Sequence, residues 1–186
     1  MVSRISDDSP AGERLSIVLA HGRAMGSGEH ETTRSCLEEL EEIPLEPAAR
    51  VLDLGSGTGI LAVAAARLGA RSVIALDPSP EAIRATAATV RLNGLAGVIV
   101  PLQGEIGALR NTRFDLILAN LYGDVLLLLV RETAALLAPG GYLVASGIQF
   151  GDAYGIKMGF AATGCALLRE RYLEDYCTLV FRREQP

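Results

Sequence analysis

The chain has 186 residues, of which 49% are hydrophobic and 21% charged, which is enough for one domain with a sizeable core and excludes wholesale disorder. A formal net charge of −5 gives no general attraction to nucleic acid or to an anionic membrane, so neither is an expected partner. The three cysteines have no paired spacing and there are two histidines, which argues against a Cys/His zinc site and fits a reducing cytoplasm.

The chain begins with the polar, acidic stretch MVSRISDDSPAGERL, which is unlike a signal peptide. We expect a flexible tail over residues 1–14 and a single domain over residues 15–186. The stretch LSIVLA at 15–20 predicts a strand or an extended segment that leads into a glycine-rich loop. A helix with one apolar face is predicted to begin near Thr32 and to end at Pro44.

From there, short apolar strands alternate with helices. This alternation is typical of an α/β domain with a mostly parallel sheet. The apolar run VLLLLV within one of these helices is too short to span a bilayer. The remaining predicted strands cover 50–54, 72–76, 97–101, 114–119, 142–146 and a closing pair at 166–171 and 176–181; the predicted helices cover 59–69, 80–93, 123–137 and part of 151–163.

The sequence VLDLGSGTG joins the first of these strands to the next helix, and its glycines allow a sharp turn and close approach of a ligand. Asp77 ends the following strand, where an acid can accept hydrogen bonds from ribose hydroxyls. Asp53 precedes the first glycine, and would repel a pyrophosphate but attract the ammonium of an amino acid. The loop therefore favours an adenosyl amino acid over a dinucleotide, with a purely structural turn as the alternative. The three glycines are Gly55, Gly57 and Gly59.

These residues resemble the class I S-adenosylmethionine-dependent methyltransferases, whose first motif is matched by 53–59 and whose second motif is matched by Asp77. The resemblance implies a Rossmann-like fold and S-adenosyl-L-methionine as the cofactor. In that family a polar or acidic residue after the third strand lies near the adenine; here Glu105, or else Gln103, takes that place. The fourth motif ends a strand with a polar residue that faces the methyl group, which here is Asn120.

The opening stretch GRAMGSGEHETTRSCLEEL is more specific, because it is similar to the loop A-F-G-T-G-x-H-x-T-T of the bacterial ribosomal-protein lysine methyltransferases, the PrmA family. The segments LDLGSGTGILAVAAARLGA, ALDPSPEAI, ANLYGDVLLLL, LLAPGGYLVASGI and TLVFRR follow in that family's order over residues 15–183. The resemblance implies a seven-stranded sheet whose last strand is antiparallel, with the 23–33 loop over the cofactor. It also implies four contacts to S-adenosylmethionine, from Thr33, Gly55, Asp77 and Asn120.

The chain also departs from the family pattern. The family's enzymes carry an additional amino-terminal domain that captures the ribosomal protein, whereas about 14 residues precede the catalytic part here. The family's proline and phenylalanine near the opening loop are replaced by His21 and Met25. After Asn120 the family reads I-L-A-x-P-L and this chain reads LYGDVL, which lies where an acceptor would approach.

The expected function is S-adenosylmethionine-dependent N-methylation of a protein side chain, with a ribosomal protein as the partner that the resemblance implies. A small-molecule methyltransferase and a non-catalytic S-adenosylmethionine-binding module are the alternatives. Asn120 is the expected catalytic residue, because its carbonyl can orient an amine; a turn-forming role is the other interpretation. Tyr122 and Asp124 are candidate acceptor contacts. His30 could act as a base, but capping of the next helix is the preferred interpretation.

Overall fold

The computed structural model describes residues 16–20, 28 and 30–185, and in these residues seven strands form one sheet in the order β3-β2-β1-β4-β5-β7-β6. The first five strands pair in parallel, and β7 lies antiparallel between β5 and β6. This confirms the predicted α/β class with its antiparallel last strand. The strands are β1 Arg50–Leu54, β2 Ser72–Asp77, β3 Ile99–Gln103, β4 Phe114–Asn120, β5 Leu137–Gln149, β6 Cys165–Tyr172 and β7 Tyr176–Arg183.

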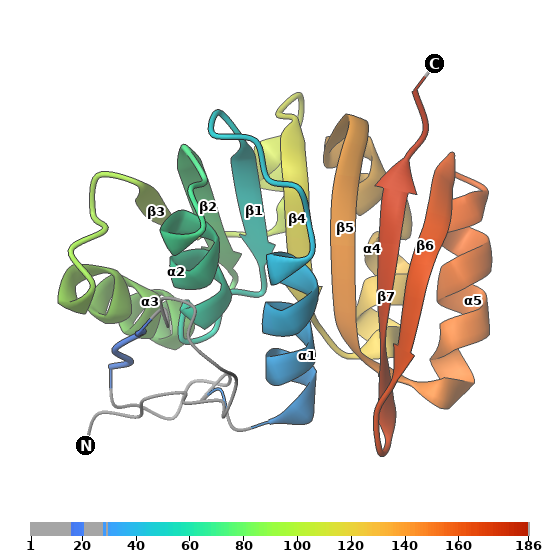
Figure 1. The fold of residues 1–186 in the computed structure, drawn as a ribbon, viewed down its shortest axis with the longest axis horizontal. Helices are drawn as coiled ribbons and strands as arrows, with labels where there is room; N and C mark the ends of the chain where they lie inside the picture. Colours follow the sequence, from blue (N-terminus) through green and yellow to red (C-terminus); the bar gives the residue numbers. More distant parts are fainter. Residues whose placement is uncertain (1–15, 21–27, 29, 186) are drawn as a thin grey trace.

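Helices cover both faces of the sheet, with α1 and α2 in front and α4 and α5 behind in the view of Figure 1. The central strand β4 is apolar because it contributes to both faces: Leu116 and Leu118 pack in one core cluster, and Ile117 and Ala119 in the other. The helices are α1 Glu31–Glu41, α2 Ile60–Arg67, α3 Pro80–Leu92, α4 Gly123–Leu136 and α5 Phe150–Ala161, with a short 3-10 helix, η1, at Ile106–Leu109.

Several predicted boundaries differ from the structure. Of the two expectations for residues 15–20, the strand is not formed in the described residues 16–20; their backbone is held by side chains of α3 and its cap, with the amides of Val18 and Ala20 donating to Asn93 and Thr89. Strand β3 begins two residues later than predicted, and η1 was not predicted. Strand β5 begins at Leu137, five residues before the predicted strand at 142–146, and its pairing with β4 shifts register between Phe114 and Leu116.

Two predicted features lie outside the described residues. The flexible tail is one of them. Most of the 23–33 loop, which the resemblance implies to lie over the cofactor, is the other; of that loop the structure describes Gly28 and residues 30–33.

Candidate functional site

A crevice of about 630 Å³ lies at the carboxyl ends of β1, β2, β4 and β5, where parallel α/β sheets bind ligands. Its volume is typical of pockets that bind small molecules or cofactors. Six of the eight predicted site residues line it: Thr33, Asp53, Gly55, Gly57, Asp77 and Asn120.

The other two predicted residues do not line this crevice. Gly59 is the N-cap of α2, where its φ of 81° puts it in the left-handed region. A Cβ there would lie 2.9 Å from Thr86 Cγ2, so this glycine allows close packing against α3. Glu105 is exposed at the N-cap position of η1, beyond the end of β3.

The glycine loop after β1 is fixed by the strand beside it. The backbone amides of Gly55 and Ser56 both donate to the Leu76 carbonyl, at 2.8 and 3.1 Å. Gly55 has a φ of 78°, and a Cβ there would lie 2.4 Å from Leu121 Cδ2. Both facts favour glycine at this position, as the motif predicted.

Asp77 ties the loops that follow β1 and β2. One of its carboxylate oxygens accepts from the Gly57 amide at 3.1 Å, and the other accepts from the Ser79 amide at 2.9 Å. Ser79 in turn caps α3 by accepting from the Ala82 amide, as the sequence predicted. The carboxylate therefore holds the crevice wall in shape while its edge lines the crevice.

Asp53 is a buried carboxyl group at the base of the crevice, and its Oδ2 accepts from the Ala62 amide of α2 at 3.0 Å. Burial raises its pKa from 3.8 to about 7; the hydrogen bond from Ala62 opposes this shift, and the nearby Asp77 charge adds to it. A nearby ammonium group would favour the charged form of such a carboxyl. The environment of Asp53 thus fits the amino-acid end of an adenosyl amino acid.

Asn120 and Thr33, which are far apart in the sequence, meet at the other side of the crevice. The Asn120 side-chain amide donates to the Thr33 hydroxyl at 3.1 Å. This bond leaves the amide oxygen of Asn120 beside Gly147, where a Cβ would lie 3.1 Å from that oxygen and 2.5 Å from the Leu121 carbonyl. The carbonyl oxygen of Asn120 is therefore available as an acceptor next to a residue that must be small.

His30 caps α1, which confirms the preferred interpretation. Its Nδ1 accepts from the Thr32 amide at 3.4 Å and lies 2.8 Å from the Thr32 hydroxyl. The imidazole also lines the crevice, so its position does not remove the alternative role as a base. Its ring lies edge-on to that of Tyr176, a crevice residue to which sequence reasoning gave no role.

Several other residues that line the crevice were not predicted from the sequence, each for an identifiable reason. Gly147 follows the polar end of a predicted strand, a position that should have drawn attention in a parallel sheet. Val125 and Leu121 follow Asn120 and read as ordinary helix and turn residues. Tyr176 gave no signal in the sequence, because it reaches the crevice only through the antiparallel return of β7.

Within the described residues, no group of three or more His, Cys, Asp and Glu side chains is arranged to hold a metal ion. The described helices include none with the length and apolar character needed to cross a bilayer.

Comparison with protein families gives one match that covers almost the whole chain: the model described as Ribosomal protein L11 methyltransferase (PrmA) matches residues 1–184. The chain belongs to the PrmA family. The resemblance seen in the opening loop and the glycine motif is thereby confirmed.

Curated relatives agree with this assignment. The chain is 39% identical to the ribosomal protein L11 methyltransferase of Chloroflexus aurantiacus over 91% of its own length and 58% of that protein. It is 43% identical to the protein of the same name from Pelotomaculum thermopropionicum, over 82% of the chain and 49% of that protein. The chain thus spans about half the length of the curated relatives it matches.

A solved structure shows the same fold. The crystal structure of ribosomal protein L11 methylase from Lactobacillus delbrueckii subsp. bulgaricus matches with a TM-score of 0.85 and 29% identity, covering 97% of this chain and 92% of that one. An RNA methyltransferase from Salinibacter ruber, solved with S-adenosyl-L-homocysteine, matches with a TM-score of 0.67 and 19% identity, over 84% of this chain and 95% of that one. At that identity the likeness is one of fold alone.

Proposed function

We propose that the chain is an S-adenosylmethionine-dependent methyltransferase that methylates an amine nitrogen of a protein side chain. The observation that carries this proposal is the pairing of Asp53 and Asp77 with the Asn120–Thr33 contact around one crevice. Membership of the PrmA family supports the same conclusion. The proposed setting is the cytoplasm.

The proposed cofactor site uses the two acids and the glycine loop. Asp77 would accept hydrogen bonds from the ribose hydroxyls, Asp53 would attract the ammonium end, and the loop at 55–59 would allow close approach. Thr33 would contact the cofactor through its hydroxyl or amide. Glu105, which lies beyond the crevice lining, stays a prediction for the adenine end.

The proposed catalytic role of Asn120 is to orient the acceptor. S-adenosylmethionine supplies an activated methyl group, so the protein's task is largely alignment of the acceptor with that group. The carbonyl oxygen of Asn120 can accept a hydrogen bond from an amine N–H, because the amide nitrogen is engaged by Thr33. This arrangement would direct the nitrogen lone pair toward the methyl group.

The proposed acceptor is a lysine-type amine on ribosomal protein L11, the protein that the relatives' names give as their substrate. The chain matches 58% and 49% of the lengths of those two relatives, so the docking of L11 is tested directly.

The proposal is tested by ligand binding and by methyl transfer in parallel. S-adenosylmethionine and S-adenosylhomocysteine should raise the melting temperature of the protein, whereas NAD should not, because only ligands that bind the folded state stabilise it. Labelled methyl groups should then be incorporated into purified L11. Absence of stabilisation by both adenosyl compounds would contradict the proposal.

Asn120→Ala provides the matched catalytic test. Methyl transfer should fall about 100-fold or more, because alignment is lost, while the affinity for S-adenosylhomocysteine changes less. Binding of the cofactor without transfer to L11 or to a lysate protein fraction would instead favour a non-catalytic module, and transfer into the small-molecule fraction would replace the protein acceptor.

A further inference from the structure

Three aromatic side chains line the crevice in addition to the proposed cofactor contacts. They are His30 at the N-cap of α1, Tyr122 just before α4, and Tyr176 at the start of β7. The ring centroids of His30 and Tyr176 lie 5.5 Å apart at an interplanar angle of 67°, an edge-to-face contact. Tyr122 comes two residues after Asn120 and is 57% exposed, so this lining lies on the open side of the crevice.

The turn between β6 and β7 is fastened to the start of α1, which places Tyr176 beside His30. The Glu31 carboxylate accepts from the backbone amides of Glu174 and Asp175 in this turn, at 3.1 and 3.5 Å. Because Glu31 directly follows His30, the same helical turn that caps α1 also holds the hairpin.

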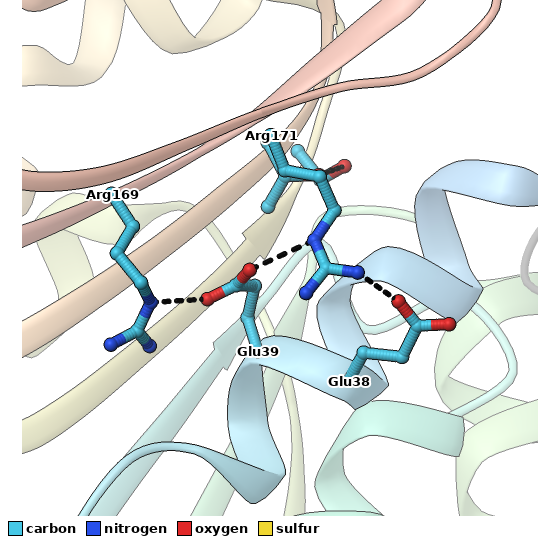
Figure 2. A network of polar contacts seen from close by, with 6 residues as sticks. Glu38, Glu39, Arg169 and Arg171 are labelled. Carbon is cyan, nitrogen blue, oxygen red and sulfur yellow. Dashed lines mark hydrogen bonds and ion pairs between the residues drawn. The ribbon is translucent and has the colours of Figure 1, made fainter.

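An ion network centred on the buried Glu39 fastens the rest of α1 to β6, as Figure 2 shows. Glu39 is 3% exposed, and its two oxygens accept from Arg169 Nε at 2.8 Å and Arg171 Nε at 3.0 Å. Arg171 also pairs with Glu38. The hairpin is thus held to α1 at both ends of the helix, and the aromatic lining belongs to a fixed wall.

The charges of the crevice as a whole favour a cation. None of the described residues that line it is Lys or Arg, and its acids, Asp53, Asp77 and Glu81, lie on the side formed by β1, β2 and the start of α3. Two further acids, Glu174 and Asp175, are exposed in the turn that precedes Tyr176. The negative faces of aromatic rings attract ammonium groups and also pack against alkyl chains, whereas they repel a phosphate or carboxylate.

We propose that Tyr176, together with Tyr122 and His30, forms an acceptor slot that selects an alkylammonium side chain. Tyr176 is then a specificity-determining residue supplied by the β6–β7 hairpin. The inference rests on the proposed function only in naming the bound side chain a methyl acceptor. The selection of an alkylammonium group by the three rings does not depend on methyl transfer. The aliphatic stem would pack on the rings while the charged head lies near their faces.

The test measures binding of a permanently charged probe, Nα-acetyl-trimethyllysine amide, and of its neutral counterpart with carbon in place of the charged nitrogen. Both are titrated into the full chain by ligand-observed NMR, with and without S-adenosylhomocysteine. The cation should bind about tenfold more tightly than the neutral compound. Tyr176→Phe should retain this preference, and Tyr176→Ala should reduce it to about twofold or less.

Tyr172→Ala is the matched control, since Tyr172 is on the same hairpin, is 63% exposed and lies outside the crevice lining. It should keep the full preference. Equal binding of the two probes to the unmodified chain, or an unchanged preference in Tyr176→Ala, would overturn the slot. Binding of S-adenosylhomocysteine, measured in the same samples, reports on the proposed function separately, because the slot requires no cofactor.

Discussion

The two halves of the crevice are built in different ways. The proposed cofactor half consists of the loops after β1 and β2, in which backbone amides are held by the Leu76 carbonyl and by Asp77. The proposed acceptor half is assembled from the start of α1, the residues after β4, Gly147 and the β6–β7 hairpin. One half therefore depends on hydrogen bonds that hold the backbone amides of its loops, and the other on side-chain contacts between segments far apart in the sequence.

This difference indicates which part of the crevice can change in sequence without changing the rest. A loop whose amides are already paired with the sheet keeps its shape whatever lies across the crevice. The acceptor wall instead depends on individual contacts, such as Asn120 with Thr33 and Glu39 with two arginines. The chain's departure from the family pattern after Asn120 falls in this second half.

The largest expected effect is on the ion network of the acceptor half. Replacement of both Arg169 and Arg171 by Met leaves the Glu39 carboxylate, 3% exposed, without its ionic partners. The free energy of unfolding should fall by about 3–5 kcal/mol, measured by urea denaturation, because an unpaired charge is left buried.

The same network offers its own controls. Adding Glu39→Met to the double variant should recover most of the lost stability. Three methionines would then stand in place of Glu39 and its two arginines, and no unpaired charge would be left buried. Glu38→Gln should cost at most about 1 kcal/mol, because the Glu38 side chain is 41% exposed. A double variant as stable as the unmodified protein would mean that the hairpin is held by its strand pairing alone.

Asp53 gives a pH-dependent test of the cofactor half. Its pKa is raised from 3.8 to about 7 by burial, so between these values the unfolded chain ionises Asp53 while the folded chain keeps it protonated. This contribution favours folding fully below pH 4 and is lost as the pH rises through about 7, by on the order of 4 kcal/mol in total.

Asp53→Asn should remove this titration. The stability of the variant relative to the unmodified protein should rise between pH 4 and pH 7 and then level off, which urea denaturation at each pH would show. A difference that stays constant across this range would place the carboxyl in a more polar environment than its burial indicates.

The sequence predicted the fold because strand–helix alternation is a local signal, and most of the predicted site residues line the crevice, where their part in cofactor binding stays a prediction. Strand–helix alternation set the sheet, and the glycines with Asp77 mark one strand–loop–helix unit and the strand after it. The acceptor half was predicted in part: Asn120 and Thr33 were found by resemblance. Tyr176 was not found, since the antiparallel return of β7 and the contact of Glu31 with the β6–β7 turn bring it to the crevice. Contacts between residues far apart in the sequence leave no short sequence motif.

Gly147 packs against the residues at the end of β4, and its replacement tests how tightly this part of the crevice is packed. It has a φ of 80°, and a Cβ there would lie 2.5 Å from the backbone oxygen of Leu121. Gly147→Ala should therefore lower the free energy of unfolding by about 2–3 kcal/mol, through backbone strain and the contact. Gly151→Ala is the control, because nothing lies within 4 Å of its Cβ position in α5. It should be neutral or stabilising by up to about 1 kcal/mol, and equal losses in both variants would show that Gly147 is not closely packed.

Asp77→Asn should have the smallest effect on stability and a specific effect on the cofactor. The two carboxylate oxygens accept from different backbone amides, Gly57 and Ser79, so the amide group of Asn must turn an N–H toward one of these donors. Loss of one charge-assisted hydrogen bond and of the ribose contact should weaken S-adenosylhomocysteine binding about 10- to 100-fold by calorimetry. Glu81→Gln changes another acid of the same crevice, one with no predicted cofactor role. Its affinity for S-adenosylhomocysteine should stay within about threefold of that of the unmodified protein. Equal losses of affinity in the two variants would assign the effect to the overall charge of the crevice and would contradict a contact between Asp77 and the ribose.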